Sequence, residues 1–243
     1  MITLIMPFYR NCEMLKIHYR NWASWPENLK EKYNIIIVDD GSPEPAVDVP
    51  RLYDLPSLSI YRVLEDRLWH QHAARNLGAH VANDGWLLLT DMDHLLTEEN
   101  AYALSKRVRV LNENIFYMLN RVEVTTGKQT TTVDGNPKPH PNSFVMTRDL
   151  YWKIGGYDED FCGIYGTDGL FKARAMKVAS KGFLNKVSLI RYWRDIVPDA
   201  STVGIPRKEG REVGARERIF AEKAMCGDPN SVKVLQFPWE QVL

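Results

Sequence analysis

The chain has 243 residues, of which 44% are hydrophobic and 26% are charged, as in ordinary soluble globular proteins. Lysine and arginine together number 31, and aspartate and glutamate together also number 31, so the formal net charge is zero. This balance argues against a general nucleic-acid-binding protein, which usually carries an excess of basic residues. The length is sufficient for one large domain with its own core.

The cysteine pattern and the N-terminus indicate the compartment. Cys12, Cys162 and Cys226 are far apart in the sequence and form no CxxC pair, so neither a disulfide framework nor a structural zinc site is expected. The apolar residues 1–6 are too few for a signal peptide, and no stretch approaches the ~20 apolar residues of a membrane span. We therefore expect a cytoplasmic protein without a transmembrane segment, for which any membrane contact would be peripheral.

Short apolar runs alternate with longer amphipathic runs in the first half of the chain. The predicted strands are 2–6, 34–38, 58–63 and 86–89, and the predicted helices are 12–24 and 71–82. The run 34–38 is rich in β-branched residues and precedes Asp-Asp-Gly-Ser, which is typical of a buried parallel strand that ends in a sharp turn. Because strands alternate with helices, the sequence predicts a mostly parallel sheet with helices on both faces.

The second half has longer connections between its elements. The predicted strands are 115–124, 143–147 and 188–193, and the predicted helices are 149–154, 168–181 and 216–224. Prolines, glycines and charges at 197–214 predict a flexible loop. The apolar residues 237–239 are expected to dock the tail on the body. No linker separates the two halves, so we predict one α/β domain over 1–243.

Polar clusters follow three of the predicted strands and begin at Pro7, Asp39 and Asp91. Ligands bind beyond the carboxyl ends of parallel strands, so these clusters should share one edge of the sheet. Converging carboxylates repel one another unless a cation or donor groups compensate, and a hard divalent ion bridges such oxygens to phosphate. Each cluster alone is ordinary turn or surface chemistry. Their order and spacing after apolar strands favour a functional interpretation.

Five segments between residue 2 and about residue 175 form a series. They are Leu4–Asn11, Ile36–Ser42, Ala74–Gly78, Leu88–Asp93, and a block made of Gly155–Phe161 and Gly166–Asp168. In this order they resemble the motifs of family 2 glycosyltransferases, with the second and last segments the most specific. The resemblance implies a GT-A fold, which is a Rossmann-like α/β sheet flanked by helices. It also implies a nucleotide-sugar-binding half at 1–100 and an acceptor-binding half at 101–243.

The resemblance implies a metal-dependent enzyme that transfers a sugar from a nucleotide-diphosphate sugar, with a UDP-sugar as the expected donor. The acceptor would be a hydroxyl of a glycan or of another molecule, and the anomeric centre would be inverted. Such a reaction needs a neutralised diphosphate leaving group, which Mn²⁺ or Mg²⁺ and cationic side chains supply. It also needs a carboxylate that deprotonates the attacking hydroxyl.

The resemblance assigns donor-side roles to individual residues. The expected nucleotide-sugar contacts are Pro7, Tyr9, Arg10, Asp39, Arg75 and Asp91. Asp39 is expected to accept a hydrogen bond from the base, and Arg75 to lie near the base or the diphosphate. Asp91 is expected to contact the ribose or the water shell of the metal. Asp93 is expected to ligate the metal.

Acceptor-side roles follow from the last block. Asp168 is expected to be the general base, although this chain has Thr167 where the family often has Glu, which leaves Asp158 as an alternative base. Asp158 and Glu159 are otherwise expected to shape the acceptor site. His140, between two prolines, is expected on the surface as an acceptor or phosphate contact, or as a further metal ligand.

Other residues leave two interpretations open. His94 either packs locally or shifts the metal site by one position, and His70 and His72 lack the i, i+4 spacing of a helical metal pair. Aromatic residues that either fill the core or stack on a sugar are Trp152, Tyr157, Phe161 and Tyr165. A basic stretch is either a solvated surface or a mobile lid over the diphosphate, and it comprises Arg207, Lys208, Arg211, Arg216 and Arg218.

Three other functions compete with sugar transfer. A sugar nucleotidyltransferase would usually carry a glycine-rich phosphate loop early in the chain, and none follows Met6. A dinucleotide-dependent oxidoreductase is disfavoured because no GxGxxG follows the first strand. A catalytically silent nucleotide-sugar-binding module remains an alternative, because the acidic flank of Asp168 is missing.

Overall fold

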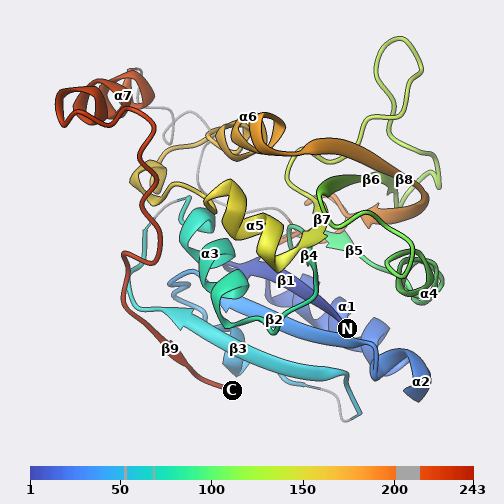
Figure 1. The fold of residues 1–243 in the computed structure, drawn as a ribbon. Helices are drawn as coiled ribbons and strands as arrows, with labels where there is room; N and C mark the ends of the chain where they lie inside the picture. Colours follow the sequence, from blue (N-terminus) through green and yellow to red (C-terminus); the bar gives the residue numbers. More distant parts are fainter. Residues whose placement is uncertain (52–53, 68, 201–213) are drawn as a thin grey trace.

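The computed structural model describes residues 1–51, 54–67, 69–200 and 214–243 (Figure 1). Within them, nine strands form one sheet in the order β5-β8-β6-β7-β4-β1-β2-β3-β9. The strands are β1 (Ile2–Phe8), β2 (Tyr33–Asp39), β3 (Ser57–Val63), β4 (Trp86–Leu89), β5 (His94–Leu95), β6 (Ile115–Glu123), β7 (Phe144–Thr147), β8 (Ser180–Arg191) and β9 (Trp239–Gln241).

The helices lie on both faces of this sheet (Figure 1). They are α1 (Cys12–Ala23), α2 (Glu27–Lys30), α3 (Gln71–Val81), α4 (Glu98–Arg107), α5 (Arg148–Ile154), α6 (Gly169–Val178) and α7 (Ala215–Met225). Two short 3-10 turns are η1 (Ala46–Asp48) and η2 (Glu159–Phe161). The arrangement is the α/β sheet flanked by helices that the sequence predicts.

The strand directions bring several strand ends to one edge. Strands β4, β1, β2 and β3 are parallel neighbours, with Phe8 opposite Asp39 and Ile5 opposite Leu89. Strand β7 runs antiparallel to both β4 and β6, and β6 is parallel to β8. Strands β4, β6 and β8 therefore point the same way. The loops after β1, β2, β4, β6 and β8 consequently share the carboxyl edge of the sheet.

Successive side chains of the central strands point to opposite faces of the sheet and so contribute to two apolar clusters. Leu4 and Met6 of β1 face one apolar cluster, which α1 and α4 cover, whereas Ile5 faces the other, which α3, α5 and α6 cover. Strand β2 alternates in the same way, with Ile35 and Ile37 on the first side. A strand buried on both faces needs apolar residues at every position, which explains the continuous runs in the sequence.

The second half of the fold departs from the sequence prediction at β8. The helix predicted over 168–181 ends at Val178, and the strand predicted to start at residue 188 starts at Ser180. The reason is tertiary: β8 gains a parallel partner in β6, and Gly182 lies where a Cβ atom would be 2.5 Å from the Tyr117 ring. Strand β5 and helix α4 are additional elements that the sequence analysis did not predict.

The C-terminal tail docks on the body as predicted. Strand β9 pairs antiparallel with β3 at the far edge of the sheet. The predicted flexible loop at 197–214, with its proposed basic lid, lies mostly at 201–213, outside the described residues. The three cysteines are free thiols. No helix in the described part of the chain combines the length and apolarity that crossing a bilayer requires.

Helix α3 approaches the sheet at Gly78, and this contact is testable. A Cβ atom there would lie 2.4 Å from Ile5 Cγ2, so Gly78→Ala should overpack the core at a cost of about 1–3 kcal/mol, offset by up to about 1 kcal/mol of helix propensity. Gly169→Ala is the matched control, because a Cβ atom on Gly169 meets nothing within 4 Å. We expect urea unfolding to show a lower free energy of unfolding for Gly78→Ala but not for Gly169→Ala. Equal stability of the two variants would contradict the close approach.

Candidate active site

Asp39 builds the turn after β2. Its carboxylate accepts hydrogen bonds from the backbone N–H groups of Gly41, Ser42 and Ala46, at 3.1, 2.7 and 2.8 Å. Arg62 forms an ion pair with the Asp39 carboxylate at 3.1 Å, and Asp39 is only 1% exposed. Burial raises the pKa of Asp39, while the backbone donors and Arg62 lower it. We therefore revise the role expected for Asp39: it holds the turn instead of facing a base.

Asp40 is the more available member of this aspartate pair. Its Oδ1 atom is buried without a hydrogen-bond partner among the described residues. Burial, and then the charge of Asp39, raise the pKa of Asp40 well above its ordinary value. A buried carboxyl oxygen that no protein group satisfies is a candidate contact for a ligand. The sequence predicts two neighbouring acids here, but it does not show which of them accepts the hydrogen bonds of the turn.

The loop after β1 lies beside this turn. Tyr9 donates its hydroxyl hydrogen to Asp66 at 2.9 Å, and burial is the main cause that raises the pKa of this phenol. Arg10 has a positive φ of 54°, its backbone N–H donates to Ser42 Oγ at 3.1 Å, and its side chain is exposed. Pro7 lies within β1, opposite Val38. The structure thus places Tyr9 and Arg10 at the same sheet edge as Asp40, and their contact with a nucleotide stays a prediction.

Asp91 lies directly after β4, in contact with two nitrogenous side chains. It forms an ion pair with Arg75 of α3, which is completely buried. His140 Nε2 lies 3.4 Å from the other carboxylate oxygen. Burial raises the pKa of Asp91 to about 6; Arg75 lowers it, and the charges of Asp93 and Asp168 raise it. The acids after β4 and before α6 are therefore close enough to affect one another.

His140 is buried, so the expectation that it lies on the surface is wrong. It is 7% exposed, its ring lies 4.1 Å from that of His94, and its Nδ1 is 2.9 Å from Ser143 Oγ. Burial, and next the nearby His94, lower its pKa well below the ordinary value. The flanking prolines suggested a surface loop, but they do not reveal that the loop folds back onto Asp91.

The Asp91-Met92-Asp93 loop is held by two histidines. His18 of α1 donates from Nε2 to the Met92 carbonyl oxygen at 2.8 Å. His94 Nδ1 lies 2.6 Å from Asp93 Oδ1. His94 is therefore a local partner of Asp93, as the plainer interpretation of the sequence proposed. The role of His18 carried no sequence signal beyond its place on the apolar face of a helix.

Asp93 has the donor set for a divalent cation that is shared with a ligand. Its side chain is 17% exposed, and within the described ranges its second oxygen accepts no hydrogen bond. No group of three metal-capable side chains occurs among the described residues. Asp91 is already engaged by Arg75. The residues fit a hard cation held by Asp93 and completed by phosphate oxygens and water, rather than a cage made by the protein.

Asp168 lies at the start of α6, facing the Asp91 loop. Its carboxylate accepts a hydrogen bond from Gln71 of α3. The hydroxyl oxygen of the preceding residue, Thr167, lies 3.4 Å from His72 Nε2. Asp168 itself is only partly buried. Two side chains of α3 thus position the end of the acceptor block.

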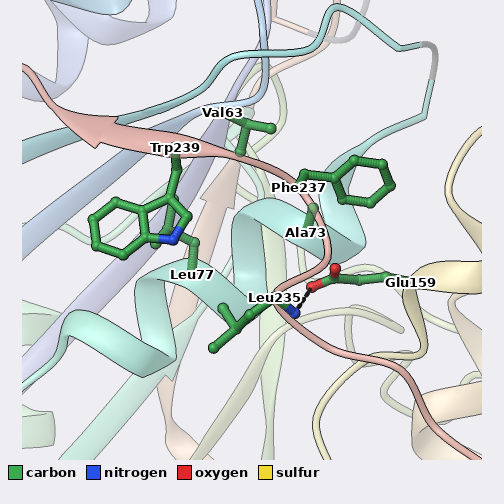
Figure 2. A pocket seen from close by; sticks show the side chains of 7 residues that line it. All are labelled: Val63, Ala73, Leu77, Glu159, Leu235, Phe237 and Trp239. Carbon is green, nitrogen blue, oxygen red and sulfur yellow. Dashed lines mark hydrogen bonds between the residues drawn. The ribbon is translucent and has the colours of Figure 1, made fainter.

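Asp158 and Glu159 anchor the C-terminal tail. Glu159 is 1% exposed and accepts hydrogen bonds from the backbone N–H groups of Leu235 and Gln236, at 2.8 and 2.7 Å. Asp158 pairs with Lys223 at 3.1 Å. Figure 2 shows Glu159 bonded to the tail, beside a small apolar gap of about 10 Å³. Because both carboxylates are engaged inside the protein, we revise their expected acceptor-binding role to a structural one.

The aromatic residues near this block mostly fill the core. Tyr157 and Phe161 are each 1% exposed, and Tyr157 stacks on Phe171 with ring centres 4.2 Å apart. Tyr165 differs, because it is only partly buried and lies against Trp69 at 4.6 Å. Of the aromatics singled out in the sequence, Tyr165 is therefore better placed to meet a ligand than Tyr157 or Phe161.

The α/β fold and its edge of acids suit a glycosyltransferase, and comparison with known proteins shows that class. Residues 3–166 match the profile of Glycosyl transferase family 2. This range is more than half of the chain, so the chain belongs to that family and is a glycosyltransferase. No curated protein matches the sequence.

Solved structures agree on the fold. S. aureus TarS 1–349 in complex with UDP-GlcNAc gives a TM-score of 0.64 at 14% identity, covering 91% of this chain and 66% of that one. The same protein in complex with UDP gives 0.61 at 13%, covering 82% and 62%. Mannosyltransferase PcManGT from Pyrobaculum calidifontis, in complex with GDP-Man and Mn²⁺, gives 0.54 at 16%, covering 78% and 56%. The chain spans less than two thirds of each of these structures. At such identities the likeness establishes the GT-A fold.

The two aspartates after β2 should respond differently to the same substitution. Asp39→Asn should destabilise the fold by about 1–3 kcal/mol, because the turn loses acceptor charge at buried N–H groups. Asp40→Asn should leave stability nearly unchanged but weaken UDP binding. Thermal unfolding and calorimetric UDP titration of both variants separate the two effects. If Asp39→Asn alone weakens UDP binding in a stable protein, the assignment is reversed.

Proposed function

We propose that this protein is an inverting, metal-dependent glycosyltransferase that moves a sugar from a UDP-sugar to an acceptor hydroxyl. The observation that carries the proposal is the Arg75–Asp91 ion pair, which lies where the charges of Asp93 and Asp168 both reach Asp91. A metal-ligating acid and a candidate base thereby meet at one sheet edge. Sugar transfer between a diphosphate and a hydroxyl needs this pairing of functions.

The donor would lie along the loops after β1, β2 and β4. Asp40 has a carboxyl oxygen without a partner that can bind the base, and Tyr9 and Arg10 flank it. The TarS complexes contain UDP and UDP-GlcNAc, whereas the mannosyltransferase complex contains GDP-Man. We favour uridine because two of these complexes carry it. The buried Arg75 acts by holding Asp91 instead of reaching the diphosphate itself.

The cation, Mn²⁺ or Mg²⁺, would be held by Asp93. When bound, it neutralises the charge that develops on the departing diphosphate. His94 supports this function by orienting the Asp93 carboxylate through a 2.6 Å contact. His18 holds the intervening Met92 carbonyl from the other side of the loop. These two histidines act as positioning residues and leave one oxygen of Asp93 available.

Asp168 would be the general base. It accepts the proton of the acceptor hydroxyl while the acceptor oxygen forms a bond to the anomeric carbon. The bond from that carbon to the diphosphate oxygen breaks, and the nucleoside diphosphate leaves with the electron pair. A single displacement of this kind inverts the anomeric centre. Asp158 is the weaker candidate because it is 5% exposed and paired with Lys223.

Replacing the base should affect chemistry more than donor binding. Asp168→Asn should lower kcat by about 10²–10⁴-fold, with the donor KM changed by no more than about twofold. UDP release from UDP-GlcNAc and other UDP-sugars, with Mn²⁺ and an acceptor panel, measures both. Asp134→Asn, in an exposed loop, is the matched control and should resemble the wild type. A fully active Asp168→Asn variant would exclude this residue as the base.

Replacing the metal ligand should instead change the metal dependence. Asp93→Asn removes a negative charge, so the Mn²⁺ concentration for half-maximal UDP-sugar hydrolysis should rise by about tenfold or more. In thermal-shift measurements, Mn²⁺ should increase the stabilisation by UDP in the wild type but not in this variant. An unchanged Mn²⁺ dependence would show that the cation is held elsewhere or is not required.

A further inference from the structure

Two arginines lie at the carboxyl ends of β6 and β8, outside the site described so far. Arg121 is on β6 and Arg191 ends β8, and both strands are parallel to β4. The two side chains therefore belong to the same sheet edge as Asp93. The contact is close, because the backbone N–H of Tyr192 donates to the Asp93 carbonyl oxygen at 2.9 Å.

Arg121 is a mostly buried cation at this edge of the sheet. The residue is 8% exposed, and within the described part of the chain its guanidinium donates no hydrogen bond and forms no ion pair. Burial, and next the nearby charge of Arg191, lower its pKa. The Nε atom of Arg191 is also buried without a partner. A guanidinium with a buried, unpaired Nε atom is stabilised when an anion supplies the acceptor, so the two arginines favour an anionic ligand.

An aromatic ring completes the surroundings of the two arginines. The Arg191 guanidinium lies 3.3 Å from the centre of the Trp193 ring, and Trp193 Nε1 donates to Glu123 at 2.5 Å. Glu123 also lies 3.6 Å from Arg191, whereas Arg121 forms no ion pair within the described residues, although the charges of Glu123 and Asp93 reach it and raise its pKa. Trp193 is 39% exposed. An exposed ring beside one arginine of this pair suits a ligand that has both a ring or polyol and a negative charge.

We propose that Arg121 and Arg191 form an anion-binding subsite for the acceptor, which takes a phosphate or carboxylate carried by the acceptor sugar or polyol. This rests on the proposed function. The sheet order supports an acceptor ligand, because β6 and β8 lie on one side of β4, whereas β1 and β2, with Tyr9 and Asp40, lie on the other. A donor spread along β1 and β2 would reach Asp93 with its diphosphate, and the arginines would lie beyond it.

The same anion chemistry could come from the donor diphosphate, so the experiment separates the two sources. Glucose 6-phosphate is the probe and glucose is its neutral counterpart, both measured by saturation-transfer NMR on the full chain with saturating UDP and Mn²⁺. We expect glucose 6-phosphate to bind at least about tenfold more tightly than glucose. Arg121→Gln should weaken glucose 6-phosphate by about tenfold or more, and the exposed Arg109→Gln control should not.

Three outcomes would overturn the proposal. They are displacement of glucose 6-phosphate by UDP, equal binding of glucose, and unchanged binding in a folded Arg121→Gln variant. If Arg121→Gln does not fold, Arg191→Gln and the wild-type competition between UDP and glucose 6-phosphate decide the question. Failure of the proposed function looks different: no UDP-sugar is turned over and UDP does not bind, while Arg121-dependent binding of glucose 6-phosphate persists. That result would leave an anion site and remove its assignment to the acceptor.

Discussion

The buried charge of Arg75 is the constraint on which the arrangement of this edge depends. The side chain is completely inside the protein, pairs with Asp91, and donates to the Asn142 carbonyl oxygen at 3.1 Å. Its guanidinium also lies 5.5 Å from the centre of the Tyr157 ring. Helix α3, the loop after β4, the loop before β7 and the acceptor block are therefore tied to one cation. Loss of Asp91 would leave the buried charge of Arg75 uncompensated, which costs about 3–5 kcal/mol.

Acids crowd the same edge, and each is stabilised in a different way. Asp39 is neutralised by backbone N–H groups and Arg62, Asp91 by Arg75, and Asp93 is partly compensated by His94. Within the described residues, the side-chain partner of Asp168 is the neutral amide of Gln71. The acids without a charged partner, Asp40 and Asp168, are therefore the ones free to respond to a ligand. An acid whose charge is fully compensated by protein groups has a structural role. An acid whose charge is only partly compensated is a candidate for function.

Much of the donor half could be predicted because its signals are local. The β-branched run before Asp39 predicts a buried strand and turn, and the alternation with helices predicts the parallel order. Which aspartate the turn would satisfy depends on three backbone N–H groups and on Arg62, 23 positions away, and no local pattern shows this. The burial of His140 and the early start of β8 at Ser180 likewise depend on distant partners, Asp91 and β6.

Charge is distributed unevenly across β4, although the chain as a whole is neutral. Among the described residues, Asp40 Oδ1 is a buried acceptor without a partner on the β1 and β2 side, whereas on the β6 and β8 side the Nε atoms of Arg121 and Arg191 are buried donors without one. Burying a cation on one side of β4 and an acid on the other, each with a polar atom that no described residue pairs, costs free energy in the fold without ligands. Ligands of complementary chemistry on the two sides of Asp93 would compensate both groups at once. Under the proposed function, the base of the donor would lie on one side of Asp93 and a negatively charged acceptor on the other.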